Sequence, residues 1–401
     1  MNTTDEQHPW MLSNYEYGGG VNALHDEIEH FYNYIISTPT EYMMRMEAIC
    51  RIESVVLSTW PQASIEVFGS FCTGLNLPVS DIDIAVNNFY WQGGEPLTDL
   101  KNALDSRGVA DNIIVVDKAR VPVVKFKERL SQIKFDISFN TTSGVKAAEL
   151  VKMFIEQFPE LPKLVLVLKQ YLVQLGVNDV YNTGGVSSYA LTLMCIGFLQ
   201  KQALETSTAT SGYKSHKKLG QLLLKFLEYY GRKFDFYNYA ISVRRHGGCV
   251  EKTELLYNFG GSLSMLTIED PITPSNNIGR SSFGVMYVKQ CFQRGFANLS
   301  KMVDLDASKV NGSILAKLIT MPETTIIYRN WVHYTFQHFA NTGYGWGGDF
   351  HYAVESKYNA TSMSEKYKQE EEEVVEEDLK NNFKDLSLSS HNNNGCENTK
   401  A

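Results

Sequence analysis

The stretch that decides the fold is Val67-Phe68-Gly69-Ser70-Phe71, followed by Pro78-Val79-Ser80-Asp81-Ile82-Asp83-Ile84-Ala85-Val86. Asp81 and Asp83 stand two residues apart in an alternating apolar run, so a strand would project both carboxylates from one face. Such close carboxylates raise each other's proton affinity unless a cation lies between them, and Mg²⁺ is a divalent ion that takes oxygen ligands. The alternative is a turn that leads into an ordinary strand.

Gly69 and Ser70 end an apolar strand at a point where a helical turn can begin. Glycine lets the backbone approach a phosphate closely, and a serine hydroxyl with free N–H groups can bind its oxygens. A third acid, Asp136, interrupts a second apolar strand at Ile133 to Phe139, where an unpaired buried charge is costly. A neighbouring strand that carries Asp81 and Asp83 would bring the three acids around one pair of metal ions. The three motifs together favour a catalytic site over an ordinary strand edge.

Length predicts two domains and a tail, because single cores rarely exceed about 250–300 residues, and the order of the expected strands and helices predicts an α+β fold. The chain has 401 residues, of which 43% are hydrophobic and 12% aromatic, with a formal net charge of −8. No apolar run approaches the roughly 18–20 residues of a membrane span, so we expect no membrane association. Six cysteines without a C-x-x-C pair indicate a reducing compartment and argue against a structural zinc site.

Hydrophobic periodicity predicts where the elements lie. Helices are expected at 21–37 and 41–59, and a small mixed sheet with one helix follows. We expect strands at 64–68, 82–86, 112–117, 121–126 and 133–139, with a helix at 97–106. Further helices are expected at 144–158, 162–175, 186–203, 218–230, 283–299 and 311–320.

These elements group into five regions. We expect a flexible N-terminus over 1–20, a helix over 21–47 that packs into the central domain, a catalytic domain over 48–150, a mostly helical domain over 151–330 and a low-complexity tail over 331–401. Glu365 to Asp385 holds nine acidic and four basic residues, so the tail carries much of the negative charge. Polar segments of this kind bury too little surface to fold.

Three stretches of the helical domain carry candidate ligand-binding groups. Lys169 lies in the apolar run Leu164 to Tyr171, where it either binds an anion or extends its ammonium group to the surface. Gly184-Gly185 precedes a helix that is expected to begin near Ser188 and Tyr189. The start of this helix could offer N–H groups to a phosphate, and Tyr189 could stack its ring on a base. The alternative is an ordinary helix with a serine N-cap and a tyrosine in the core. The loop Ile268 to Ser282 contains Arg280, which can reach a phosphate or a carboxylate.

In sequence, the chain resembles the DNA polymerase β-like nucleotidyltransferases, through Gly-Ser, Asp-x-Asp and the distant Asp136 in that order. Within them it is similar to terminal RNA nucleotidyltransferases with a PAP-associated domain, and to the TRAMP-type poly(A) RNA polymerases. The resemblance rests on Arg51 to Val56, Val67 to Gly74, Leu77 to Asp83, Val165 to Gln170, Gly184 to Leu191 and Ile268 to Ser282. It covers roughly residues 21–330.

The resemblance implies a catalytic domain beside a helical domain, with ATP in the cleft between them. It implies that Asp81, Asp83 and Asp136 bind Mg²⁺, or Mn²⁺ in its place. It implies that the nucleotide is bound by Gly69, Ser70, Gly144, Lys169, Ser188, Tyr189, Asn276, Asn277 and Arg280. One position departs from the family, which usually has aspartate where this chain has Asn277.

We therefore expect a template-independent poly(A) RNA polymerase that adds AMP from ATP to RNA 3′ ends in RNA surveillance, processing or decay. The alternatives are transfer of UMP or mixed nucleotides to RNA, transfer to a small molecule or synthesis of short oligoadenylates, and an inactive RNA-binding scaffold. The resemblance implies a zinc-knuckle RNA-binding partner, an RNA helicase with the exosome, and a nuclear location. Since the sequence contains no long basic block, we expect the lone chain to bind RNA weakly.

Overall fold

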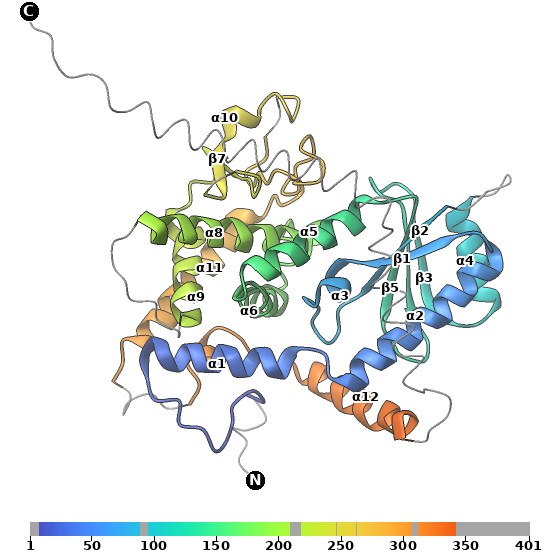
Figure 1. Cartoon of the computed structure of the whole chain (residues 1–401), viewed down its shortest axis with the longest axis horizontal. Coiled ribbons are helices and arrows are strands. Elements are labelled where there is room, and N and C mark those ends of the chain that lie inside the picture. Colours follow the sequence, from blue (N-terminus) through green and yellow to red (C-terminus); the bar gives the residue numbers. More distant parts are fainter. Residues whose placement is uncertain are drawn as a thin grey trace, which may run out of the picture. The chain divides into compact units, whose positions relative to one another are not determined.

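The computed structural model describes residues 8–88, 95–208, 218–245, 247–261, 263–306 and 312–341. All of them lie in one compact unit, residues 1–342. Figure 1 shows a sheet flanked by α2 and α4, and a group of helices that includes α1, α8, α9 and α11. The fold is thus of the α+β class, as the sequence predicts. The boundary at residue 150 between two domains stays a prediction.

The sheet has five strands in the order β1-β2-β5-β4-β3. The pair β2–β5 is parallel and the other pairs are antiparallel, which makes the sheet mixed. Helices α2 and α4 cover the face formed by residues such as Val124 and Phe126, because α4 packs on β3 and β4 and α2 packs on α4. The strands are β1 (Ser64–Phe68), β2 (Ile82–Asn87), β3 (Ala110–Val116), β4 (Val123–Glu128) and β5 (Lys134–Phe139), and the helices are α2 (Pro39–Thr59) and α4 (Pro96–Ser106).

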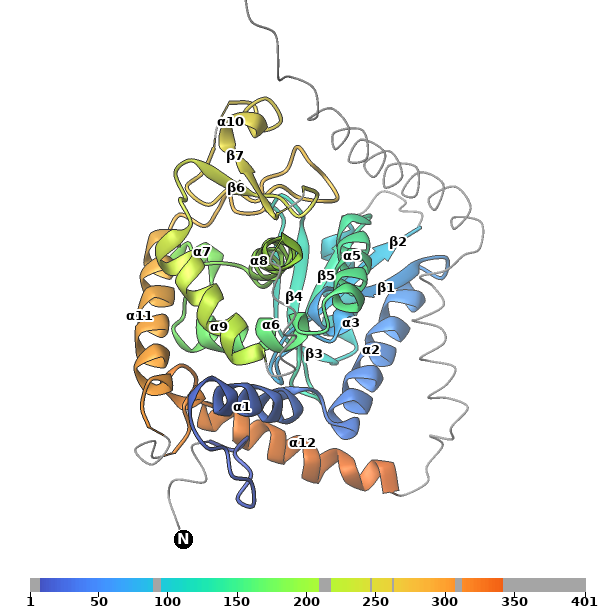
Figure 2. The same cartoon turned by 60° about the vertical axis from the view of Figure 1, so that its left-hand side comes forward.

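The helical part is built around α6 (Leu161–Gln174), in which every residue from Leu164 to Leu172 is buried. Such a helix is apolar all round because other helices enclose it. Figure 2 shows α8 and α9 beside α6, with α1 below them. The other elements are α1 (Gly20–Ile35), α5 (Ser143–Gln157), α7 (Val180–Thr183), α8 (Ser188–Thr208), α9 (Leu219–Glu228), a π-helical turn (Tyr229–Lys233), β6 (Tyr239–Ile241), β7 (Cys249–Glu251), α10 (Lys252–Leu255) and α11 (Val285–Val303).

The expectation of a flexible N-terminus is wrong for residues 8–19. Trp10 is 1% exposed and packs edge-on against Phe31 of α1, with ring centroids 5.4 Å apart. A buried indole of this size contributes about 150–250 Å² of contact, enough to hold the segment that carries it. Residues 1–7 lie outside the described part of the chain.

The prediction of a helix over 311–320 is also wrong. Within residues 312–320, the only helical segment is one 3₁₀ turn, Leu315–Lys317. The buried carboxylate of Glu27 accepts hydrogen bonds from the hydroxyl of Ser313 and from the N–H groups of Ile314 and Leu315 (both 2.8 Å). Gly312 precedes this turn at φ +82°. The backbone donors are thus satisfied by a distant side chain, and they do not need a longer helix.

The tail expected from residue 331 begins later than predicted. Helix α12 (Glu323–Asn341) runs through it, and Val332 is fully buried. This helix packs on α2. Residues 342–401 lie outside the described part. Among the described residues, the helices are all too short or too polar to cross a membrane.

Candidate active site

Two of the three acids are neighbours in the sheet. Asp83 on β2 and Asp136 on β5 are paired in the parallel register, and Asp81 comes directly before β2. Ile82 and Ile84, which alternate with the acids, are fully buried on the other face. The alternation that the sequence predicts therefore brings the acids to one face of the sheet.

The electrostatics of the acids disfavour their charged forms. Burial, together with the charges of Asp136 and Asp81, raises the pKa of Asp83 to about 7. Burial and Asp136 also raise the pKa of Asp81. Carboxyl groups in this situation bind a proton or a cation, since either removes the repulsion.

The third acid, Asp136, forms an ion pair with a lysine on the neighbouring strand. Lys125 on β4 stands opposite Asp136 in the antiparallel register, and its ammonium group donates to the Asp136 carboxylate. In the described residues, no three acidic, histidine or cysteine side chains are placed to hold a metal ion as they stand. The donor set suits Mg²⁺ chemically, because it consists of mutually repelling carboxylate oxygens. A third ligand would become available when Asp136 turns away from Lys125.

Gly69 begins the short helix α3 (Gly69–Thr73) directly after β1, at φ +70°. A Cβ atom there would lie 2.1 Å from Oδ2 of Asp83, so only glycine fits against this carboxylate. At Gly144, near the start of α5, a Cβ would lie 2.6 Å from the Phe68 ring. Gly69 thus allows the backbone to approach Asp83 closely, and Gly144 allows α5 to pack against the Phe68 ring.

Lys169 extends from α6 toward the acids and is 6% exposed, so its ammonium does not reach the surface. Its Nζ donates to the carbonyl of Leu75 at 3.0 Å. Burial lowers its pKa to about 8, against the charges of Asp83 and Asp81. A single neutral acceptor leaves donors of the ammonium available for an anion.

The start of α8 presents Ser188 and Tyr189. Ser187 accepts from the N–H of Ala190 at 3.2 Å, so the capping serine is Ser187 and the Ser188 hydroxyl is not the cap. The Tyr189 hydroxyl is buried and has no hydrogen-bond partner among the described residues. Burial, with the Asp270 charge nearby, raises the pKa of Tyr189 above its ordinary value.

The loop that precedes α11 holds three residues that were predicted to bind the nucleotide, and these residues make different contacts. Asn276 donates to Asp270 at 2.7 Å and accepts from Arg120 of the β3–β4 loop. Asn277 shapes the loop itself: its oxygen accepts from the N–H groups of Ile268 and Gly279, both at 2.9 Å, and its amide donates to Ser264 at 2.9 Å. Arg280 is exposed.

A cleft of about 750 Å³ brings these groups together. Nine of the twelve residues predicted from the sequence line it, namely Gly69, Ser70, Asp81, Asp83, Gly144, Lys169, Ser188, Tyr189 and Asn276. Asp136, Asn277 and Arg280 do not line it. The volume is within the usual range of about 300–1,000 Å³ for small-molecule sites.

Four charged residues of this region were not predicted from the sequence. Asp270 and Lys134 line the cleft, Lys125 binds Asp136 and Arg120 binds Asn276. Lys125 gave the same signal as Asp136, a charge inside an apolar strand. Arg120 gave no comparable signal, because it lies in a loop and its partner is 156 residues away.

Two family models match the sequence. Residues 24–156 match the central palm domain of the mitochondrial-like poly(A) RNA polymerases, and residues 218–276 match the Cid1 family of poly(A) polymerases. Among solved structures, the polymerase core of TRAMP, an RNA surveillance complex, is similar with a TM-score of 0.68 and 31% identity, over 78% of this chain and 98% of that one. The Cid1 poly(U) polymerase, at 22% identity, shares the fold, with a TM-score of 0.59 over 69% of this chain and 93% of that one.

Curated relatives extend this similarity. An inactive non-canonical poly(A) RNA polymerase protein, Trf4-2 of Drosophila melanogaster, is 56% identical over 82% of each chain. The poly(A) RNA polymerase cid14 of Schizosaccharomyces pombe is 34% identical over 72% of this chain, and poly(A) RNA polymerase protein 1 of Saccharomyces cerevisiae is 33% identical over 74%. The chain spans 42% and 47% of the length of these last two. It belongs to the family of non-canonical poly(A) RNA polymerases.

Proposed function

We propose that this chain is a template-independent RNA polymerase that adds AMP from ATP to RNA 3′ ends. The observation that carries the proposal is a cleft lined by Asp81, Asp83, Gly69, Ser70 and Lys169, with Asp136 on the neighbouring strand directly beside Asp83. One relative is named inactive, so activity does not follow from family membership alone. The three acids of the chemistry are nevertheless all present in this chain.

The roles follow from charge and position. Asp81, Asp83 and Asp136 would hold Mg²⁺ or Mn²⁺, which supplies charge stabilisation for the attacking 3′-oxygen and the leaving pyrophosphate. Ser70 and the N–H groups of α3 would bind phosphate oxygens, and Lys169 would bind a second side of the triphosphate. Tyr189 presents its ring for stacking on the base, and Asn276 and Ser188 lie beside it in the cleft.

Other parts of the proposal rest on similarity. Likeness to the polymerase core of TRAMP, an RNA surveillance complex, supports a role for this chain within a larger assembly that acts on RNA. The zinc-knuckle RNA-binding partner, the RNA helicase with the exosome and the nuclear location are proposed from the sequence resemblance. Direct contact of Asn277 and Arg280 with the base is not supported by their positions, so we assign base contact to the residues that line the cleft.

The test is extension of a labelled oligoribonucleotide by the purified full-length chain, with Mg²⁺ and each nucleoside triphosphate in a separate reaction. We expect extension with ATP and much less with UTP, GTP or CTP. The Asp81→Ala/Asp83→Ala variant is the control and should not extend RNA. Preferential extension with UTP would make the chain a uridylyltransferase of the same fold.

A second candidate is an inactive RNA-binding scaffold. It is favoured by the ion pair between Lys125 and Asp136, which occupies the third carboxylate. The same assay separates the two: a scaffold binds the oligoribonucleotide but extends it with no nucleotide, and its RNA affinity does not change when Asp81 and Asp83 are replaced.

A further inference from the structure

Two lysines face each other on the same face of the sheet as the acids. Lys127 of β4 is directly opposite Lys134 of β5 in the antiparallel register. On β4, Lys127 lies two residues after Lys125, and on β5, Lys134 lies two residues before Asp136, so the two cross-strand pairs are adjacent on one face. Alternate residues of a strand share a face, so Lys125, Lys127, Lys134 and Asp136 lie together, away from the buried Val124 and Phe126.

Among the described residues, neither ammonium group is held by a direct contact, although Asp111 of β3 is the other cross-strand neighbour of Lys127 and the charge of Lys134 acts on Asp81. In the described part of the chain, neither Lys127 nor Lys134 makes an ion pair or a hydrogen bond through its side chain, whereas Lys125 binds Asp136. Like charges directly opposite on a sheet repel each other, and an anion that lies between the two side chains would remove this repulsion. Lys134 is exposed and lines the cleft beside Asp81, and Lys127 continues the row beyond the cleft edge.

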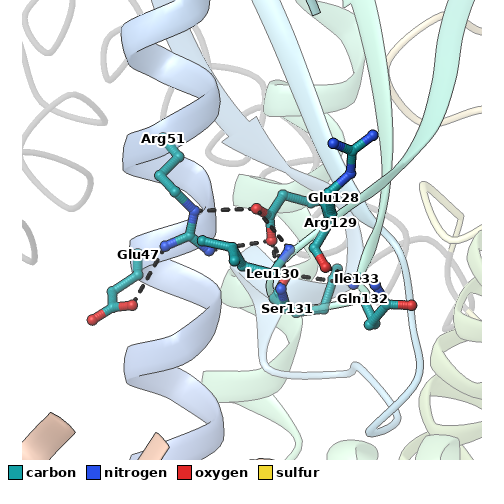
Figure 3. A network of polar contacts seen from close by, with 8 residues as sticks. All are labelled: Glu47, Arg51, Glu128, Arg129, Leu130, Ser131, Gln132 and Ile133. Atoms are coloured by element: carbon teal, nitrogen blue, oxygen red, sulfur yellow. Dashed lines mark hydrogen bonds and ion pairs between the residues drawn. The ribbon is translucent and has the colours of Figure 1, made fainter. Parts of the chain in front are cut away.

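The turn that joins the two lysines is held by a buried carboxylate (Figure 3). Glu128 is 1% exposed and accepts from Arg51 of α2 through both oxygens, at 3.1 and 3.2 Å. It also accepts from the N–H of Ser131 at 2.7 Å, and its own N–H donates to the carbonyl of Ile133 at 2.7 Å. The register of Lys127 and Lys134 is therefore fixed before any ligand binds.

We propose that Lys127 and Lys134 form a binding site for the backbone phosphates of the RNA chain that leads to the 3′ end. The inference rests on the proposed function, which puts the 3′-hydroxyl at the acids. Two residues advance a strand by about 6.6 Å, a distance of the order of one nucleotide step, so the pair lies where the preceding phosphates would pass. Lysine is a flexible point charge that binds phosphate without base preference.

The competing anion is the triphosphate of ATP. Its expected ligands are Ser70, the N–H groups of α3, and Lys169, which enters the cleft from α6. Lys127 does not line the cleft, so a triphosphate in the cleft has no reason to contact it. The geometry therefore favours RNA over ATP as the ligand of the pair, and the two sources can be measured separately.

The experiment measures the dissociation constant of a short labelled oligoribonucleotide, without nucleotide, at several salt concentrations. For Lys127→Ala/Lys134→Ala we expect at least severalfold weaker binding. The slope of log K against log salt should become shallower by about 1.4, since each phosphate contact with a single strand contributes about 0.7. Lys127→Arg/Lys134→Arg should restore the affinity. Lys101→Ala/Lys301→Ala, which removes two exposed lysines from α4 and α11, should leave both quantities unchanged.

Thermal melting provides the folding control, and the alanine variant should melt close to the wild type, because the repulsion that it relieves is offset by the lost attraction of Lys127 to Asp111 and of Lys134 to Asp81. Unchanged RNA affinity and salt slope in that variant would overturn the proposal, as would absence of salt-dependent RNA binding by the wild type. Weaker ATP binding with unchanged RNA binding would assign the pair to the triphosphate instead. A wild type that binds RNA through these lysines but extends it with no nucleotide would refute the proposed function and leave this site intact.

Discussion

Asp83 is enclosed by Asp81, Asp136 and the turn at Gly69, and these surroundings govern how its charge affects stability. A carboxyl group whose pKa is raised by folding holds its proton longer in the folded state than in the unfolded chain. Without metal, the free energy of unfolding should therefore fall as pH rises from about 4 to about 7, the interval between the unfolded and folded pKa of Asp83. Above that interval the loss stays constant.

The variant Asp83→Asn isolates this effect. We expect this variant to lack the pH-dependent fall in the free energy of unfolding, which in the wild type amounts to up to roughly 4 kcal/mol, because one pKa unit corresponds to about 1.4 kcal/mol. Urea unfolding in EDTA at pH 5 and pH 8 measures it, and Asp111→Asn, at an exposed ion pair, is the control. Mg²⁺ should stabilise the wild type at pH 8 and the variant much less. Equal pH dependence of the two proteins would contradict the assignment.

Asn277 illustrates a residue whose role is settled by its hydrogen bonds. Its oxygen accepts from two backbone N–H groups and its amide donates to Ser264, so its polar atoms are used within the loop. The resemblance implies that Asn277 binds the nucleotide, whereas these contacts favour a role in shaping the turn.

We therefore expect Asn277→Asp to leave the composition of the added tails unchanged, because aspartate keeps both accepted hydrogen bonds. Asn277→Ala should lower the free energy of unfolding by about 1–3 kcal/mol, since it orphans two backbone donors. Sequencing of tails made from an equimolar mixture of the four nucleotides checks the first expectation, and urea unfolding checks the second. A purer adenosine tail from Asn277→Asp would show that the residue does read the base.

At the scale of elements, α12 binds the linker between α1 and α2 through hydrogen bonds and an ion pair. Arg329 donates to the carbonyls of Tyr34 and Ile36 and pairs with Glu41, with Nε–Oε1 at 2.7 Å and Nη2–Oε2 at 2.9 Å. Tyr328 next to it donates to the carbonyl of Ser131 in the β4–β5 turn at 3.0 Å. One helix thus contacts both the junction of α1 with α2 and the turn of the catalytic sheet.

Arg329→Ala should lower the free energy of unfolding by about 3–5 kcal/mol, because it leaves the buried Glu41 carboxylate without its partner. Asn330→Ala, an exposed neighbour on the same helix, should change it by less than about 0.5 kcal/mol. In a double-mutant cycle, Glu41→Gln should recover part of the loss. Equal stabilities of the Arg329 and Asn330 variants would show that α12 does not hold the linker.

At the scale of the whole molecule, the net charge of −8 is unevenly distributed along the chain, since residues 365–385 hold nine acidic and four basic residues. We expect deletion of residues 367–401 to leave the melting temperature unchanged and the extension rate within about twofold, because a polar, low-complexity sequence of this composition buries too little surface to contribute to a core. Melting and extension assays of the shortened and full chains, at physiological salt, measure both. A severe loss of extension would show that these residues take part in the reaction.

Much of the fold and of the site follows from local patterns in the sequence. Alternating apolar residues around Asp81, Asp83 and Asp136 predict strands with the acids on one face, and β2 and β5 have that arrangement. Gly69 and Ser70 at the end of β1, and Ser188 and Tyr189 at the start of α8, lie where periodicity and capping rules place them. These features depend on neighbours in sequence, so periodicity and turn chemistry suffice to predict them.

The tertiary structure alone decided which distant groups meet. No basic block in the sequence indicates the pair Lys127–Lys134, because strand pairing joins it across a turn. Arg120 meets Asn276, and Glu27 replaces an expected helix with a single turn at Leu315. The helix that follows residue 323, and the anchoring of Trp10, likewise depend on surfaces contributed by other elements. The physical reason is common to all of them: burial and long-range hydrogen bonds outweigh local propensity, and neither can be read from neighbours in sequence.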